Sequence, residues 1–145
     1  MVTLISEWGS IGKDTLTRDQ SKILIRRGIN KRFASVYAEE TQSFPGSTKI
    51  RQTIQYKLFC FQDLLRILPK ALHFSDGRIY RFRMNYEYID NVQRFKGEWV
   101  VGYFGDQTKP IIRHSEELID ALYEIIHECL SRNIINPYEL EEELL

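Results

Sequence analysis

The chain has 145 residues, of which 43% are hydrophobic and 28% charged, and its formal net charge at pH 7 is zero. This length and composition suffice for one domain with its own core and exclude a chain that is disordered throughout. The charges are unevenly placed, because residues 1–113 hold 19 Lys and Arg against 11 acids, and residues 114–145 hold one Arg against nine acids. Such a division indicates an interaction surface or an acidic segment that folds back on its own body.

The sequence also indicates a compartment. The N-terminus lacks the basic residues and apolar run of a signal peptide, and the uncharged apolar runs fall far short of the roughly 18 residues that a membrane span requires. Two cysteines, Cys60 and Cys129, are too few for a disulfide scaffold, and both lie in apolar stretches. We expect a cytoplasmic protein with no membrane partner, a single domain over 1–145, and an acidic C-terminal extension over 134–145.

The first elements along the chain follow from local signals. A possible strand, Val2–Ser6, opens the chain, and Thr17 and Gln20 then have the spacing of a capping box. Because Gly28 suits the position just after a helix, we expect a short basic helix over 18–27. Phe33–Glu40 is prone to β structure.

The next stretch is less uniform. A Pro45-Gly46 turn after Glu40 favours a hairpin. Residues Lys49–Phe59 fit both the spacing of a helix and that of a strand, and we favour the strand. Leucines on one face predict a helix over about 62–72, with Pro69 marking or bending its end.

The second half predicts three strands and a helix. Aromatic and polar residues alternate over Arg78–Ile89, which is typical of a half-buried strand, and the Asp76-Gly77 turn precedes it. Asp90–Gly97 is expected to be a polar loop before a strand over Glu98–Phe104, and Pro110–Arg113 to be an edge strand.

The clearest helix is predicted over 115–132, with Ser115 as its N-cap and Arg132 near its end. Its apolar residues repeat at intervals of three and four, so that they form one face. The whole pattern predicts an α+β fold in which an antiparallel sheet of hairpins and a meander is covered by this amphipathic helix and the helix at about 62–72.

The best candidate for a binding site is the basic and aromatic strand. Arg78, Arg81 and Arg83 can neutralise phosphates, and Tyr80 and Tyr86 can stack on bases. The same alternation supports a second interpretation, in which the tyrosines face the core and the arginines face solvent. These five residues therefore form a candidate nucleic-acid interface, with the core interpretation left open.

Other chemistries lack a pattern. The segment Gly9–Thr15 departs from a phosphate-binding loop at Glu7 and Asp14. His114 has i,i+3 spacing with Glu117, and His127 lies two residues before Cys129, but no second Cys or His lies at metal-ligand distance from either pair. No nucleophile motif is present. Acids that border the strands are Asp76, Glu87, Asp90, Glu98 and Asp106. We assign no catalytic residue, no metal site and no cofactor.

One local resemblance carries a functional implication. Trp99-Val-Val-Gly-Tyr103 followed by Ser115-Glu-Glu-Leu-Ile-Asp-Ala-Leu122 resembles small uncharacterised α+β proteins of bacterial and phage mobile elements. Over 99–130 the order of strands and helix is also similar to HicB-type antitoxins. The resemblance implies a toxin protein as partner and carries over no functional residue.

These observations together favour a small non-enzymatic binding or accessory module that acts on a protein partner or associates with itself. The alternatives are a nucleic-acid-binding accessory protein that uses the basic and aromatic strand, and an enzyme without a recognisable motif.

Overall fold

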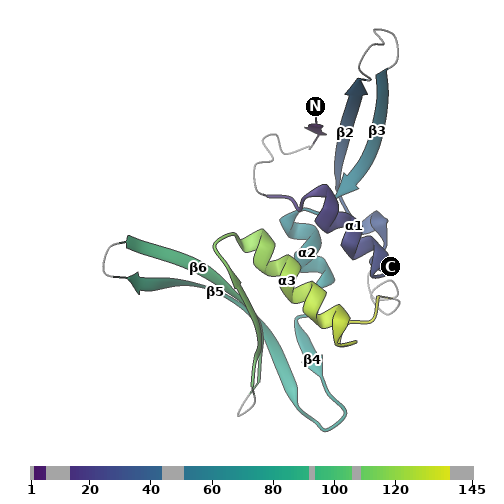
Figure 1. Ribbon diagram of the computed structural model, residues 1–145. Coiled ribbons are helices and arrows are strands. Elements are labelled where there is room, and N and C mark those ends of the chain that lie inside the picture. The colour runs from purple at the N-terminus through teal and green to yellow at the C-terminus, as the bar shows by residue number, and fades with distance from the viewer. Residues whose placement is uncertain (1, 6–13, 44–50, 92–93, 106–108, 138–145) are drawn as a thin grey trace. The chain divides into compact units, whose positions relative to one another are not determined.

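The computed structural model describes residues 2–5, 14–43, 51–91, 94–105 and 109–137 (Figure 1). The chain divides into two compact units, Met1–Cys60 and Phe61–Leu145, and each is described by itself. The expectation of one domain over 1–145 stays a prediction. Most of the segment Gly9–Thr15 lies outside the described residues. Residues 138–145, which make up most of the predicted acidic extension over 134–145, also lie outside them.

The first unit combines a small sheet with one α-helix. Its antiparallel sheet has the order β1-β2-β3. Its elements are β1 (Val2–Ile5), α1 (Arg18–Arg26), a short 3₁₀ helix η1 (Lys31–Phe33), β2 (Val36–Ser43) and β3 (Arg51–Leu58).

Helix α1 is defined by its two ends. The Thr17 side chain accepts from the backbone N–H of Gln20 while the Gln20 side chain accepts from the backbone N–H of Thr17, which is a complete capping box. Gly28 follows the C-cap Arg27 with a φ of 105°, a conformation that glycine adopts without strain. The helix predicted over 18–27 is therefore confirmed to within one residue.

The ambiguous segment Lys49–Phe59 holds strand β3. It pairs with β2 along its whole length, from Val36 opposite Leu58 to Ser43 opposite Arg51, as the preferred interpretation required. Val36, Ala38 and Leu58 form a buried cluster against which Tyr56 packs. The segment forms a strand rather than a helix because alternate residues of the two paired strands then pack into the same core.

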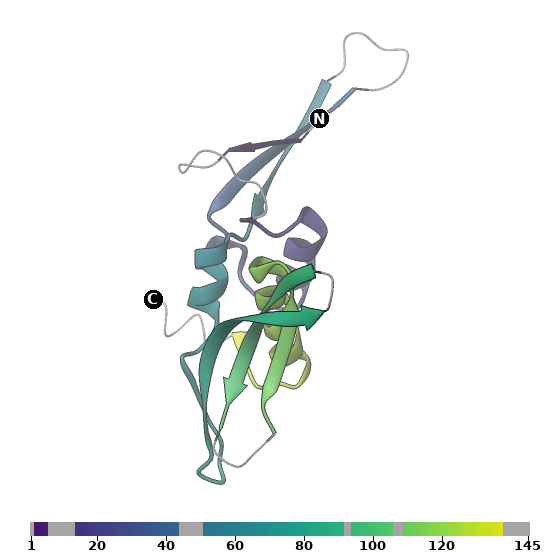
Figure 2. The same ribbon diagram turned by 90° about the vertical axis from the view of Figure 1, so that its left-hand side faces the viewer.

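The second unit is a four-stranded antiparallel sheet with two helices (Figure 2). Its strand order is β4-β5-β6-β7, and the α+β class predicted from the sequence is confirmed. The elements are α2 (Phe61–Ile67), β4 (Ala71–His73), β5 (Ile79–Asn91), β6 (Arg94–Phe104), β7 (Ile111–Ser115) and α3 (Leu118–Ser131).

Helix α3 lies against β6 and β7 and also packs on α2 (Figure 1). Its buried residues are Ile119, Ala121, Leu122, Ile125, Ile126, Cys129 and Leu130, which is the predicted apolar face. Val101 and Tyr103 of β6 are 0% exposed, and the Tyr103 hydroxyl donates a 2.7 Å hydrogen bond to the carbonyl oxygen of Pro69. The side chain of Arg113 pairs with Glu128 at 2.5 Å and so links β7 to α3.

The two helices of this unit are shorter than the sequence predicts. Helix α3 starts at Leu118, because Ser115 is the last residue of β7, where its hydroxyl accepts from the backbone N–H of Glu117. Helix α2 ends at Ile67, two residues before Pro69, and Leu72 lies in β4 rather than in the helix. A residue before proline is pushed toward extended geometry, which favours the early end.

The predicted polar loop over Asp90–Gly97 is wrong. Strand β5 continues to Asn91, and β6 already begins at Arg94. Asn91 pairs with Arg94, so that only residues 92 and 93 connect the two strands. Polar composition misled the prediction because a two-stranded ribbon can keep its backbone ladder where its side chains meet solvent.

Candidate binding surface on the β5–β6 ribbon

Strands β5 and β6 extend beyond the rest of their sheet. They pair from Arg81 opposite Phe104 to Asn91 opposite Arg94, whereas β4 pairs with β5 over 79–81 and β7 pairs with β6 over 99–103. Residues 83–91 of β5 and the paired residues 94–102 of β6 therefore extend past β4, and within the described part of the chain 87–91 and 94–98 also extend past β7. We call this extension the outer ribbon, and Figure 1 shows it running out past the start of α3.

One face of these strands continues the buried face under α3. Because side chains alternate along a strand, Met84 and Tyr86 lie on the same face as Tyr80. Tyr80 is only 5% exposed, but Met84 is 37% and Tyr86 45% exposed. With the half-buried Trp99, which lies opposite Tyr86, they form the outer apolar patch: Met84, Tyr86 and Trp99.

The patch has a defined internal geometry. The rings of Tyr86 and Trp99 meet edge to face, with centroids 5.2 Å apart. A Cβ atom added at Gly97 would lie 2.0 Å from the Tyr86 hydroxyl oxygen, so the tyrosine ring lies directly over this glycine. The glycine thus leaves room for an aromatic side chain that is held on the ribbon although solvent reaches much of it.

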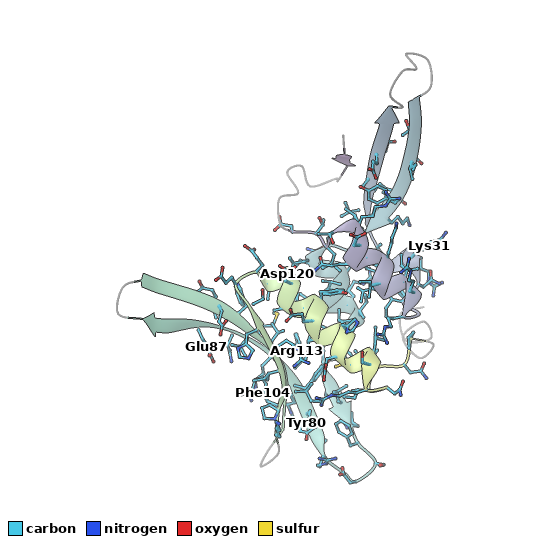
Figure 3. All side chains as sticks on the ribbon, in the orientation of Figure 1. Lys31, Tyr80, Glu87, Phe104, Arg113 and Asp120 are labelled. Atoms are coloured by element: carbon cyan, nitrogen blue, oxygen red, sulfur yellow. The ribbon has the colours of Figure 1, made fainter. Side chains whose placement is uncertain are left out.

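The opposite face of β5 is polar and exposed. It carries Arg81, Arg83, Asn85 and Glu87, all of them exposed. Within the described residues, the structure shows no ion pair for Arg81 or Arg83. Figure 3 labels Glu87 on the ribbon and Tyr80 nearer the opposite end of β5.

The five residues predicted for nucleic-acid binding do not share one surface. Arg81 and Arg83 occupy the polar face of β5, whereas Tyr80 and Tyr86 occupy the other face, and Tyr80 is buried. Arg78 lies just before β5, where its guanidinium pairs with Asp76 at 2.5 Å and lies over the rings of Phe74 and Tyr80. The alternation that suggested the site therefore separates its phosphate-binding and stacking groups, and their binding role stays a prediction.

The Asp76–Arg78 pair belongs to the turn between β4 and β5. The backbone N–H of Arg78 donates to the Asp76 carboxylate, and this bond, assisted by the Arg78 guanidinium, lowers the pKa of Asp76. Gly77 has a φ of 89°, which the turn requires of its residue at this place. Arg78 is thus engaged in holding a hairpin turn.

The acids near the strands do not converge. Asp76 lies at the turn before β5, Glu87 lies in the outer ribbon, and Glu98 contacts the His114 ring at 3.1 Å. Asp106 lies outside the described residues, and so does the side chain of Asp90. Among the residues that the structure describes, no group of three His, Cys, Asp or Glu side chains could hold a metal ion.

A shallow pocket of about 330 Å³ lies near the turn between β4 and β5. Its lining includes three cations, Arg78, Lys109 and Arg132. Two of them already have carboxylate partners, because Arg78 pairs with Asp76 and Arg132 with Glu128. Because Arg132 shares Glu128 with Arg113, these carboxylates balance only part of the pocket's positive charge.

The backbone of the outer ribbon has an edge that sequence reasoning missed. The N–H of Phe82 donates to the carbonyl oxygen of Lys70, the residue just before β4, at 3.0 Å. Backbone groups alternate in direction along a strand, so those of residues 84, 86, 88 and 90 point to this same edge. No described strand pairs with β5 there beyond Phe82. The loop predicted over Asp90–Gly97 concealed this edge, because no local sequence pattern marks how far the ladder of β5 and β6 continues.

No family model matches the chain, and no curated protein or solved structure does so either. The resemblance to mobile-element proteins and to HicB-type antitoxins over 99–130 therefore stays a prediction. Within the described residues, none of the helices has the length and apolar character needed to cross a bilayer.

Proposed function

We propose that this chain is a non-enzymatic binding module that acts on a protein partner in the cytoplasm, through its outer ribbon. The observation that supports the proposal most directly is the outer apolar patch, where Met84 and Tyr86 are exposed on the face that forms the core elsewhere in the unit. Exposed aromatic and methionine side chains on an ordered element are typical of protein interfaces.

The edge of the ribbon along which no described strand pairs with β5 beyond Phe82 supports the same conclusion. A strand edge presents a row of N–H and C=O groups that another chain can pair with, and proteins with such edges commonly bind partners by strand addition. Edge and patch meet at Tyr86, whose backbone points to the edge while its ring belongs to the patch. A partner strand could lie along this edge and cover the patch at once.

A photocrosslinking experiment in the cells that make the protein tests this proposal. p-Benzoylphenylalanine replaces Tyr86 in one variant and, as a matched control, Tyr37 of β2, which is 57% exposed in the other unit. We expect a discrete adduct from position 86 that position 37 does not give. The adduct should weaken when Met84→Asp is added, because the charge opposes burial of the patch.

The proposal fails if position 86 gives no adduct, or if both positions give the same set of adducts. Mass spectrometry of the adduct then separates a second copy of this chain from a different protein.

Nucleic-acid binding is the second candidate. Arg81 and Arg83 support it, because both are exposed on one face of β5 and neither forms an ion pair within the described residues. The opposite placement of Tyr80 and Tyr86 opposes it, since a single strand of nucleic acid would need both groups on one surface.

A further inference from the structure

We infer that the second unit binds a small organic phosphate monoester in the pocket of about 330 Å³ beside the turn between β4 and β5, which we call the cationic pocket. The site lies apart from the outer ribbon, so it adds a ligand to the proposed function and does not depend on the ribbon's partner. Three parts of the chain form its lining: the turn with the start of β5, the residues that lead from Lys109 into β7, and the end of α3.

The charge of the pocket favours an anion. Among the described residues that line it none is an acid, and the charged ones are all cations: Arg78, Lys109 and Arg132. The acids in contact with these cations are Asp76 and Glu128, and Glu128 also pairs with Arg113. These four cations and two carboxylates leave a formal excess of two positive charges. A phosphate monoester carries about two negative charges at pH 7 and would balance that excess.

The two arginines are held in place and still have donors to offer. Nε of Arg78 contacts Asp76 at 2.5 Å, and its Nη1 donates to the Tyr80 hydroxyl at 3.4 Å. Nε of Arg132 contacts Glu128 at 2.6 Å. A guanidinium has five N–H donors, so both arginines keep N–H groups that can donate to phosphate oxygens.

The uncharged part of the lining keeps water away from one side of these cations. The rings of Phe74 and Tyr80 meet edge to face with centroids 5.1 Å apart, and Tyr80, labelled in Figure 3, is 5% exposed. Ile111 of β7 is 8% exposed. Charges beside such a surface attract an anion more strongly than charges that water surrounds.

The end of α3 brings Arg132 and Ile134 to the pocket. Asn133 has a φ of 56°, and the chain turns there so that the N–H of Ile134 donates to the carbonyl oxygen of Cys129 at 2.8 Å. The N–H of Asn133 donates to the carbonyl oxygen of Leu130 at 3.2 Å. These bonds satisfy carbonyl groups of the last helical turn, whose partial negative charge would otherwise oppose an anion here.

A second pocket, of about 550 Å³, gives room for the organic part of the ligand. It shares Phe74, Arg132 and Ile134 with the cationic pocket, so the two adjoin. The rest of its lining combines polar side chains with apolar ones such as Leu72 and Ile135. Pockets of this size hold organic molecules rather than bare ions. The phosphate group therefore takes the cationic pocket, and the body of the ester extends into its neighbour.

A nuclear magnetic resonance titration of the ¹⁵N-labelled full chain tests both the binding and its place. The probes are phenyl phosphate, inorganic phosphate, and benzenesulfonate, which has a similar shape but one negative charge fewer. We expect phenyl phosphate to bind roughly fivefold more tightly than either other probe, because it alone supplies both two charges and an apolar group. The amide signals of Gly77, Ile111 and Ile134 should shift together, while that of Gly97 in the outer ribbon should not.

Charge removal tests the role of the cations. Lys109→Gln and Arg132→Gln each remove one cation of the lining, and Arg83→Gln, the matched control, removes one from the outer ribbon of the same unit. Each lining variant should raise the dissociation constant for phenyl phosphate roughly fivefold or more, and the control should change it less than about twofold. The amide spectrum of each variant shows whether the fold is intact.

Phenyl phosphate that shifts none of the three amides, or lining variants that bind it no more weakly than Arg83→Gln does, overturns the inference. Inorganic phosphate that binds as tightly as the ester would show that the second pocket holds no organic group, and equal binding of benzenesulfonate would show that one negative charge suffices. Either result overturns the assignment of a phosphate monoester. The crosslinking result at position 86 concerns the outer ribbon alone, so the failure of one proposal is distinguishable from the failure of the other.

Discussion

At the residue scale, exposure depends on position along the sheet rather than on residue type. Tyr80 and Tyr86 lie on the same face of β5, yet Tyr80 is buried and Tyr86 is 45% exposed. Phe74 packs edge to face on Tyr80 and the arginine of the turn lies over it, whereas Tyr86 lies in the outer ribbon with Trp99. The same amino acid thus serves the core at one end of the strand and a surface at the other.

The two cysteines differ in the same way, and both are thiols in the structure. Cys129 is 0% exposed on α3, and burial, reinforced by the Glu128 carboxylate, raises its pKa to about 12. Cys60 is partly exposed, and its sulfur lies 3.3 Å from the Ser35 hydroxyl. We therefore expect alkylation of the folded protein to modify Cys60 and to spare Cys129.

The raised pKa of Cys129 predicts a pH dependence of stability. The folded state keeps the proton at pH values where the unfolded chain, with a thiol pKa near 9.0, has lost it. The contribution of the buried, protonated Cys129 thiol to stability is therefore complete below pH 9 and is lost as pH rises from 9 toward 12. Urea unfolding should show a free energy that falls above pH 9 more steeply in the wild type than in Cys129→Ala, by up to about 1.4 kcal/mol per pH unit. Equal slopes for the two proteins would contradict the prediction.

At the scale of elements, α3 is the part of the chain where local pattern and tertiary contact agree. Its apolar face, read from spacing alone, is the face that packs on β6 and β7. The prediction that the helix begins after Ser115 is wrong, because Ser115 pairs with Trp99 as the last residue of β7. Strand pairing is a tertiary event, and it decided the boundary against a good local N-cap.

Truncation in α3 tests this packing. Leu122→Ala and Ile126→Ala should each lower the free energy of unfolding by about 2–5 kcal/mol, because both side chains are 0% exposed and leave a cavity. Glu124→Ala, at an exposed position of the same helix, is the control and should stay within about 0.5 kcal/mol of the wild type. Denaturant midpoints that do not move for either apolar variant would show that this face is not packed on the sheet.

At the scale of the whole molecule, the charge division follows the two units as well as the sequence. Residues 1–60 hold ten Lys and Arg against five acids, and residues 61–145 hold ten against fifteen, so the formal balances are +5 and −5. Arg81 and Arg83 therefore lie in the unit with net negative charge. This placement disfavours nucleic-acid binding by these arginines, and a binding measurement tests it directly.

If nucleic acid binds to β5, affinity for an oligonucleotide must fall steeply with salt, since each neutralised phosphate releases counterions. The combined Arg81→Ala and Arg83→Ala substitutions should then weaken binding and lower the salt slope by about one per lost contact. Deletion of 138–145 removes four glutamates and should strengthen binding if they compete for that surface. We expect instead no salt-sensitive binding in a fluorescence anisotropy titration. Binding by the intact chain that the double variant abolishes would contradict this expectation.

The elements of this protein follow largely from local patterns in its sequence. The capping box at Thr17, the glycine at position 28 and the apolar repeat of α3 specify their helices through interactions within a few residues. The alternation over β5 likewise predicted a strand and the two faces that separate arginine from tyrosine. Only the tertiary structure decided how far β5 and β6 run past the helix that covers them, and hence that Tyr86 and Met84 are exposed and that one edge is open. Burial and strand pairing depend on residues distant in the chain, so no local pattern contains them.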